Sequence, residues 1–283
     1  MKGGELFAEL ERGAMTPGKL RIWWQGQISY ALRGFAGTVL IDPFLIPMER
    51  RLVKPPFSPD DVQALDAILV THEHSDHFDK DFIVEAMEKF PELRVVLPAP
   101  LAELFVGKTP HTDRLVPAQP GDVLAFGSLK VYPVPAKHGV GMTDAYTYGR
   151  EMSGGLYRYL GYIVDMGGAT VFHSGDALVS EELVEALLAF PKPIDIALLP
   201  INGRDYFREK ANLVGNMDAR EAAALAACIH ADLVIPGHYD MFTDNAGFPG
   251  HFVEMIDRFH PDLHAAILSR QRIFTYCAPE RES

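Results

Sequence analysis

Three histidines and an aspartate fall within six consecutive residues, 72–77, directly after the apolar run of residues 67–70. Alternate side chains of an extended chain share one face, so we expect His72 and His74 to point the same way. Asp76 and His77 fall where the chain turns toward a helix and can face a second ion. Imidazole and carboxylate groups suit zinc, iron or manganese. The cluster therefore predicts a metal site at the end of a strand, in preference to an exposed patch of histidines.

The pattern His-x-His-x-Asp-His after a strand resembles the metallo-β-lactamase superfamily. The resemblance requires further ligands, and His138, Asp176 and His238 each follow or end a later strand-like run. Loops at the carboxyl ends of strands converge in sheets covered by helices, and the strands hold them rigid. We therefore expect these three side chains to join the cluster, with Asp176 bridging two ions. For each of them, a purely structural role in a turn, a cap or a loop is the alternative.

Within the superfamily, the chain is most similar to the branch of L-ascorbate-6-phosphate lactonases. The similarity spans most of the chain and lies in residues 23–27, 68–77, 119–122, 173–176 and 234–240. Two features differ from that branch. The chain is shorter, and Lys137-His138 is more similar to the third metal motif of the superfamily in general.

Two further residues are candidates for orienting the ligands. Asp42 ends a strand-like run and could accept a hydrogen bond from a ligand imidazole, although a turn at Asp42-Pro43 explains it equally well. His173 lies in the strand before Asp176, where we expect it to orient a ligand or to pack in the core.

The distribution of strands and helices predicts the fold class. Three strand-like runs in the first half, residues 20–24, 28–32 and 38–41, suit a meander. The second half repeats this order in outline, with a hairpin signal at Gly167 and Gly168. Two β-rich halves covered by helices predict an α/β fold in four layers, an αβ/βα sandwich of two mixed β-sheets flanked by helices. The resemblance implies the same fold, with the site along one edge.

Length and composition place limits on organisation, compartment and partners. No linker divides the 283 residues, so we expect one hydrolase domain over residues 1–283. A net charge of -12 argues against nucleic-acid binding through a broad basic face. No apolar run is long enough to cross a membrane, and residues 1–7 lack a secretory signal, which predicts a cytoplasmic protein. A homo-oligomer is compatible with the sequence. Cys228 is expected to be a small core residue.

The expected cofactor is a pair of divalent metal ions, zinc or manganese, with iron as a further candidate. Two such ions lower the pKa of a shared water and generate a bridging hydroxide that attacks a carbonyl or phosphoryl centre. Asp76 is the expected catalytic residue, orienting the nucleophile and passing a proton to the leaving group. The first choice of reaction is opening a lactone or cleaving an ester of a small anionic substrate that resembles a sugar phosphate.

Cations near the expected site are candidates for binding the anionic group of that substrate. The expected substrate-binding residues are Lys137 and, in a predicted loop over residues 202–210, Asn202, Arg204 and Asp205. A salt bridge that holds the fold explains Arg204 equally well. The other cations considered are Arg150, Arg158, Arg208 and Lys210. Two functional alternatives stay open: a phosphodiesterase or ribonuclease of the same fold, and a non-catalytic metal-binding sensor or scaffold.

Overall fold

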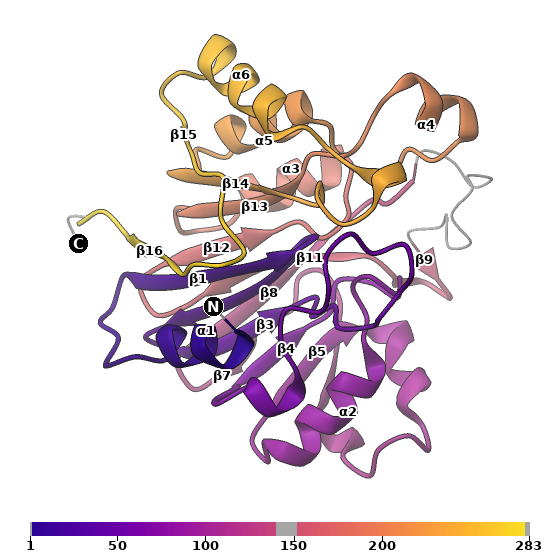
Figure 1. The fold of residues 1–283 in the computed structure, drawn as a ribbon, viewed down its shortest axis with the longest axis vertical. Coiled ribbons are helices and arrows are strands. Elements are labelled where there is room, and N and C mark those ends of the chain that lie inside the picture. The colour runs from indigo at the N-terminus through magenta and orange to yellow at the C-terminus, as the bar shows by residue number, and fades with distance from the viewer. Residues whose placement is uncertain (1, 140–151, 281–283) are drawn as a thin grey trace.

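Two seven-stranded β-sheets form the centre of the computed structural model, which describes residues 2–139 and 152–280 (Figure 1). The first sheet has the strand order β16 (Phe274–Cys277), β1 (Lys19–Gly26), β2 (Ser29–Gly34), β3 (Gly37–Ile41), β4 (Ala67–Leu69), β5 (Arg94–Pro98) and β6 (Leu115–Ala118). The second has the order β15 (His264–Ala265), β14 (Leu233–Gly237), β13 (Ile196–Pro200), β12 (Thr170–His173), β11 (Leu160–Asp165), β8 (Leu129–Pro135) and β7 (Leu124–Phe126). A separate hairpin pairs β9 (Met152–Ser153) with β10 (Leu156–Tyr157).

The two sheets repeat one pairing pattern. In the first sheet the pairings from β16 to β3 are antiparallel and those from β3 to β6 are parallel. In the second, the pairings from β7 to β12 are antiparallel and those from β12 to β15 are parallel. Both halves of the chain are therefore mixed sheets, as the sequence predicts.

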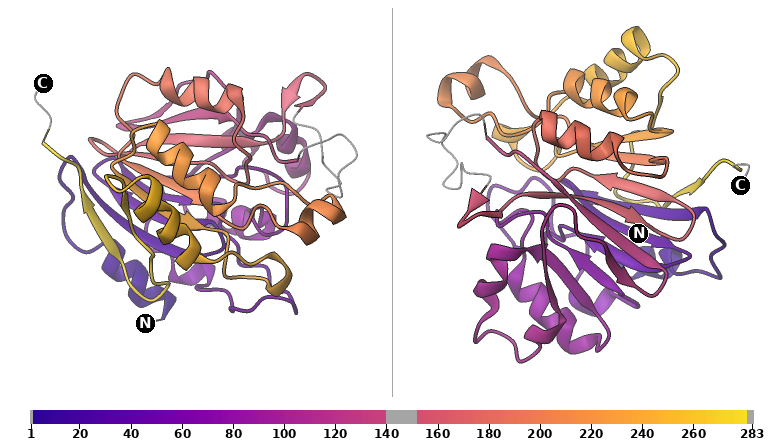
Figure 2. Two further views of the ribbon diagram at one scale, coloured as in Figure 1. Left: turned by 90° about the horizontal axis from the view of Figure 1, so that it is seen from above. Right: turned by 180° about the vertical axis from the view of Figure 1, so that it is seen from behind.

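Helices cover the outer face of each sheet (Figures 1 and 2). The first sheet carries α1 (Gly3–Leu10) and α2 (Lys80–Lys89), and the second carries α3 (Glu181–Leu188), α5 (Ala219–Cys228) and α6 (Pro249–Phe259). The remaining helices are α4 (Tyr206–Ala211) and the short 3-10 helices η1 (Pro59–Asp61), η2 (Ala99–Phe105), η3 (Thr112–Arg114) and η4 (Thr243–Asn245). Four layers result, which confirms the predicted αβ/βα sandwich.

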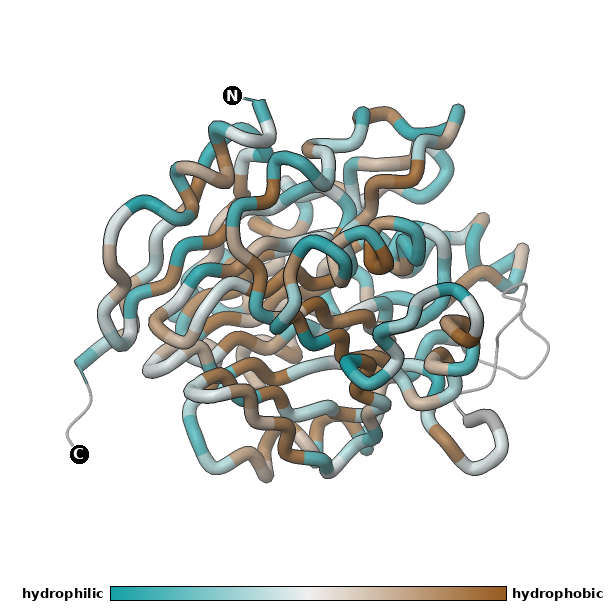
Figure 3. Tube along the Cα trace, turned by 90° about the horizontal axis from the view of Figure 1, so that it is seen from below, coloured by the Kyte–Doolittle hydropathy of each residue, from teal (hydrophilic) through white to brown (hydrophobic). Residues whose placement is uncertain are grey.

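Three hydrophobic clusters fill the spaces between these layers, and the hydrophobic segments concentrate in the strands at the centre (Figure 3). The adjacent residues Trp23 and Trp24 show how β1 serves two of them. Trp23 packs under the helices of the first sheet, and Trp24 packs between the two sheets. Successive side chains of a strand point to opposite faces, so one strand can anchor both layers.

Local sequence signals explain where several elements begin and turn. Ser180 caps α3 by accepting a hydrogen bond from the Leu183 amide, and Asp218 and Glu221 form a reciprocal capping box at the start of α5. Gly168 lies in the turn between β11 and β12 with φ 101°. That left-handed region favours glycine.

Two predictions from the sequence are wrong in detail. The expected loop over residues 202–210 contains helix α4, because Asp205 caps its first turn by accepting a hydrogen bond from the Arg208 amide at 2.8 Å. Cys228 is exposed, because it ends α5 on the solvent side of an alanine-rich helix.

Among the described residues, none of the helices combines the length and apolarity needed to cross a lipid bilayer.

Candidate metal centre

The seven candidate metal ligands lie in loops at the carboxyl ends of four strands. The segment of residues 72–77 follows β4 of the first sheet. His138, Asp176 and His238 follow β8, β12 and β14 of the second. The two sheets pack face to face, so these loops meet at one edge of the sandwich, where the contacts described below bring all seven side chains together.

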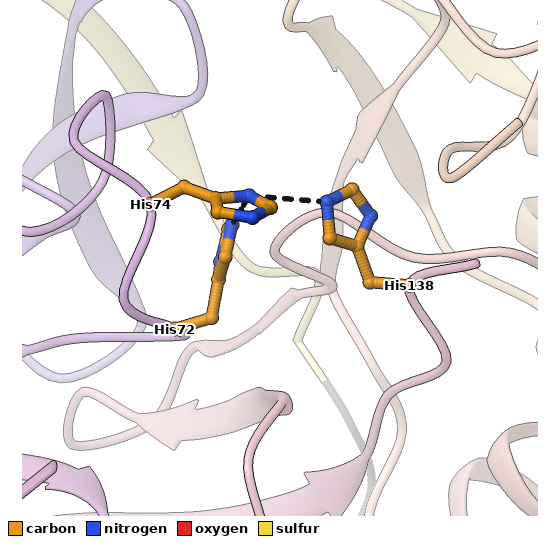
Figure 4. A group of neighbouring side chains, drawn as sticks. All are labelled: His72, His74 and His138. Atoms are coloured by element: carbon orange, nitrogen blue, oxygen red, sulfur yellow. Dashed lines mark hydrogen bonds between the residues drawn. The ribbon is translucent and has the colours of Figure 1, made fainter. Parts of the chain in front are cut away.

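Three histidines form the first group of the cluster (Figure 4). His74 Nδ1 lies 2.9 Å from His72 Nε2 and 3.2 Å from His138 Nε2. His138 is held from behind, because its Nδ1 lies 2.8 Å from the carbonyl oxygen of Gly215. The three imidazoles thus direct one nitrogen each toward a common point. This is the arrangement that a tetrahedral ion requires of three ligands.

A second group consists of Asp76, His77 and His238. Asp76 Oδ2 lies 3.7 Å from His77 Nε2 and 3.6 Å from His238 Nε2. Asp176 lies between the groups, with its Oδ2 at 3.0 Å from His238 Nε2, 3.4 Å from His77 Nε2 and 3.8 Å from His138 Nε2. Asp176 therefore lies between the two groups and contacts members of both.

The first group holds its imidazoles in the neutral form. Burial and the nearby His138 lower the pKa of His74 to about 3. Burial, together with His77 and the other two imidazoles, holds the pKa of His72 well below its ordinary value, and burial also lowers that of His138. Neutral imidazole is the form that binds a metal ion.

Carboxylates and imidazoles stabilise each other's charges in the second group. Burial raises the pKa of Asp176, but His238 and His77 outweigh it and bring the value well below the ordinary range. The pKa of Asp76 is lowered by the same two neighbours against the same burial. Burial lowers the pKa of His238, yet Asp176 and Asp76 raise it to about 9. Both carboxylates are ionised at neutral pH, as ligation of a cation requires.

Unsatisfied atoms at the centre fit a metal ion. His77 Nε2 and Asp176 Oδ1 are buried and have no hydrogen-bond partner. Buried polar atoms in native proteins are nearly always paired, and each exception calls for an explanation such as an ion or a water. A set of imidazole nitrogens and carboxylate oxygens suits a transition metal such as zinc, manganese or iron. The residues present therefore fit a transition-metal ion, the cofactor that the sequence predicts.

Asp42 and His173 lie behind the cluster. Asp42 Oδ2 lies 2.8 Å from His77 Nδ1, and the same carboxylate accepts hydrogen bonds from the amide and hydroxyl of Thr71. This is the contact expected of a residue that orients a ligand imidazole. His173 accepts from the Gly175 amide at 3.1 Å and contacts the Ile28 carbonyl at 2.8 Å, so it supports the turn that carries Asp176.

Gln27 lies at the centre, although the sequence does not single it out. Its Nε2 donates to Asp76 Oδ2 at 2.6 Å and lies 3.1 Å from His238 Nε2. In the sequence, Gln27 lies within residues 23–27, one of the segments similar to the lactonase branch, but nothing in that segment places an amide beside a metal ligand.

The expected substrate-binding residues do not gather at one place. Arg204 Nε pairs with Glu221 Oε1 at 3.0 Å, and Asp205 caps α4. Asn202 is buried and bonded to Asn245 and Asn216. Lys137 is half-buried next to His138, in a backbone bridge to residue 178. Among the other cations considered, Arg158 pairs with Glu73, and Arg150 lies outside the described residues.

A cavity of about 440 Å³ opens beside the cluster. Its lining includes His74 and Asp76 together with two arginines, Arg50 and Arg208. Arg204 instead lines a neighbouring cavity of about 220 Å³. A larger cavity of about 560 Å³, near His230, lies at the ends of α5 and α6, and its lining includes none of the candidate ligands. Of these three cavities, the one of about 440 Å³ is lined by candidate ligands.

A layered sandwich with a histidine and aspartate cluster at one edge defines a class of metal-dependent proteins, and comparison with known proteins identifies the family. Residues 37–239 match the model of the beta-lactamase superfamily domain. The chain belongs to this superfamily, as the sequence predicts.

Individual relatives agree with this assignment. The chain is 29% identical over 242 residues to a UPF0173 metal-dependent hydrolase of Pyrococcus furiosus, covering 84% of this chain and 92% of the relative. It is 22% identical over 279 residues to a Shigella boydii protein named "Probable L-ascorbate-6-phosphate lactonase", covering 87% and 77% of the two chains. The structure of a metallo hydrolase from Ignicoccus hospitalis superposes with a TM-score of 0.69 at 18% identity, covering 91% of this chain and 98% of that one.

Gly175, after β12, lies against Thr71, after β4, so its substitution tests how closely these two loops must approach. A Cβ atom at Gly175 would lie 2.7 Å from Thr71 Cβ, at φ +61°. We expect Gly175→Ala to destabilise the fold by about 1 to 3 kcal/mol, as overpacking does, and to weaken metal binding by pushing the Asp176 turn away from His72. Urea unfolding and metal titration measure the two effects.

Gly127 provides the matched control for this substitution. It has φ +63°, and nothing lies within 4 Å of an added Cβ atom. Gly127→Ala therefore introduces the same backbone strain without the clash, and metal binding should be unchanged. Equal losses of metal affinity in the two variants would show that the contact between Gly175 and Thr71 is irrelevant to the centre.

Proposed function

We propose that this chain, a metal-dependent hydrolase of the beta-lactamase superfamily, opens a lactone or cleaves an ester of a small anionic substrate with two divalent ions. The observation that carries the proposal is the cavity of about 440 Å³, which joins His74 and Asp76 of the candidate centre to the cations Arg50 and Arg208. A substrate whose anionic group binds the arginines would present its reacting bond to the cluster. The similarity to a relative named for lactonase activity supports the same choice of substrate.

The residues would hold the ions as two sets that share Asp176. His72, His74 and His138 form one set, and Asp76, His77 and His238 form the other. Divalent ions held there would supply Lewis acidity, which polarises a carbonyl or phosphoryl oxygen and brings the pKa of a water toward neutrality. Zinc or manganese, with iron as a further candidate, suits this mixture of ligands.

Asp76 is the residue that we assign to proton transfer. Its carboxylate is ionised, because His77 and His238 lower its pKa, and it lines the cavity. In this position it can accept a proton from the attacking water and pass it to the leaving oxygen, which is the role of a general base followed by a general acid. Asp42 holds the His77 ring from behind, so the arrangement is fixed before substrate enters.

Arg50 and Arg208 differ in how firmly they are held. Arg208 donates to Asp205 at 2.8 Å and to the Ala246 carbonyl at 3.1 Å, which links α4 to the segment after η4. Arg50 is exposed, and its guanidinium carbon lies 4.4 Å from the centre of the Phe242 ring. Arg208 is therefore held in place by its hydrogen bonds, whereas the guanidinium N–H groups of Arg50 can donate to an anion.

We expect Arg50→Ala to raise the KM for a carboxylated or phosphorylated lactone by one to two orders of magnitude. A charge-assisted hydrogen bond contributes about 1.5 to 3 kcal/mol, and this substitution removes it from the substrate complex. A neutral lactone, such as δ-valerolactone, should be hydrolysed with unchanged KM. Steady-state kinetics on the two substrates measure the contrast.

Arg204→Ala is the matched comparison, because the sequence favours Arg204 and the geometry favours Arg50. Arg204 pairs with Glu221 and lines the neighbouring cavity, so its loss should leave the KM of both substrates unchanged. A raised KM in the Arg204→Ala variant, with an unchanged KM in the Arg50→Ala variant, would mean that Arg204 binds the anionic group, as the sequence predicts. Equal losses on charged and neutral substrates at Arg50 would mean that specificity is apolar.

A further inference from the structure

One amide group contacts candidate ligands from both sheets. The side chain of Gln27, at the turn between β1 and β2, is fully buried. Its Nε2 donates to Asp76 Oδ2 at 2.6 Å and lies 3.1 Å from His238 Nε2. Its Oε1 is buried and has no hydrogen-bond partner. A buried amide with one unsatisfied atom destabilises a fold, so its presence beside two candidate ligands calls for a functional reason.

The backbone of Gln27 is held in place by the loop that carries His238. Its amide donates to Asp240 Oδ1 at 2.8 Å, and its carbonyl accepts from the His238 amide at 2.6 Å and from Trp24 Nε1 at 3.0 Å. These bonds fix Gln27 at φ 55°, a left-handed conformation that is costly for a residue other than glycine.

Strained backbone of this kind gathers around the centre. In the described part of the chain, the non-glycine residues with positive φ are Gln27, Asp42, Asn212, His230 and His238. Three of these five contact a candidate ligand or are one. Strain of this sort persists where the surrounding structure over-determines the conformation, and it is typical of functional sites.

We propose that Gln27 is a positioning residue for Asp76. By donating to Oδ2, the Gln27 amide fixes the rotation of the Asp76 carboxylate and keeps that oxygen on the side of His77 and His238. Carboxylates that bind metals are commonly held by a hydrogen bond of this kind, and its loss costs about 10- to 100-fold in metal affinity or activity. The inference rests on the proposed function, because it assigns a purpose to the orientation of Asp76.

Two variants separate the amide N–H from the amide oxygen. Gln27→Met keeps the length of the side chain and removes both polar atoms. Gln27→Glu keeps the shape and an oxygen but replaces the donor with an acceptor that repels Asp76. Gln25→Met is the matched control, since Gln25 is also buried at this turn but accepts its hydrogen bond from Ser29 at 2.8 Å.

The readouts are the affinity for Co²⁺, the visible absorption spectrum of the Co²⁺ protein, and kcat and KM on δ-valerolactone. We expect Gln27→Met to bind Co²⁺ about 10- to 100-fold more weakly than the parent protein. Its visible spectrum should change and its kcat should fall. Its KM should stay within about twofold of the parent value, because Gln27 does not touch the substrate. Gln27→Glu should lose at least as much kcat, and Gln25→Met should match the parent protein. Gln27→Glu decides the question if Gln27→Met does not fold.

A double-mutant cycle tests whether Gln27 acts through Asp76. In an Asp76→Ala background, Gln27→Met should change Co²⁺ affinity by less than about twofold, because the carboxylate that it positions is gone. Equal fold-changes in both backgrounds would overturn the proposal, as would a Gln27→Glu variant with the spectrum and kcat of the parent protein. If the parent protein does not hydrolyse the lactone, the proposed function fails, but Co²⁺ affinity and the spectrum still decide the role of Gln27.

Discussion

Asp76→Asn is expected to lower turnover by at least about a hundredfold, the lower end of what acid and base catalysis contributes. The substitution keeps the shape of the side chain and its hydrogen bond from Gln27, but it removes the charge and the proton acceptor. The fold should survive, because Asp76 lies in the loop after β4 and its polar contacts are with Gln27, His77 and His238. The measurements are kcat on δ-valerolactone and the circular dichroism spectrum.

Asp244→Asn is the control for this prediction. Asp244 lines the same cavity but is not among the grouped candidate ligands, so its substitution changes the charge of the cavity without changing the centre. Near-normal turnover of Asp76→Asn, or an equal loss in Asp244→Asn, would mean that Asp76 does not transfer the proton.

Removing the metal is expected to abolish hydrolysis and to lower stability. Seven candidate ligands are too many for one tetrahedral ion, and Asp176 lies between two groups, so elemental analysis should find about two ions per chain. Any ligand that binds only the folded state stabilises it, by about 2.7 kcal/mol at a concentration of 100 times its Kd. Dialysis against a chelator should therefore lower the Tm, and adding zinc or manganese should restore both Tm and activity.

The stoichiometry decides whether the centre is binuclear. A reproducible single ion per chain, unchanged on adding zinc or manganese, would contradict the two-metal proposal. Asp176→Asn provides an internal comparison, because it removes the shared carboxylate while leaving both histidine groups intact. It should retain less than the two ions of the parent protein, whereas Asp205→Asn, at the cap of α4, should retain both.

The parts of the fold that local sequence signals specify were predicted correctly. The caps at Ser180 and Asp218 depend on residues three positions apart, and the turn at Gly167 and Gly168 depends on backbone freedom. The superfamily and the layered fold were also predicted and are confirmed. Residues 72–77 directly follow the apolar run of β4, so the sequence itself places this segment at the end of a strand.

What the sequence could not specify depends on contacts between distant segments. Gln27 reaches Asp76 across 49 positions of the chain and His238 across 211, and neither contact leaves a local pattern. Arg208 lines both the cavity beside the cluster and the neighbouring one, whereas Arg204 lines the neighbouring one, and Asp205 begins helix α4 between them. The prediction of a loop over residues 202–210 gives no reason to distinguish Arg204 from Arg208.

The division of the candidate ligands between the two sheets has a consequence for how the site is assembled. The first four candidate ligands follow β4 of the first sheet, whereas His238 follows β14 of the second, 161 positions after His77. Its backbone amide must then bond the carbonyl of Gln27, from the beginning of the chain. The full set of candidate ligands therefore comes together only when the two sheets have docked against each other.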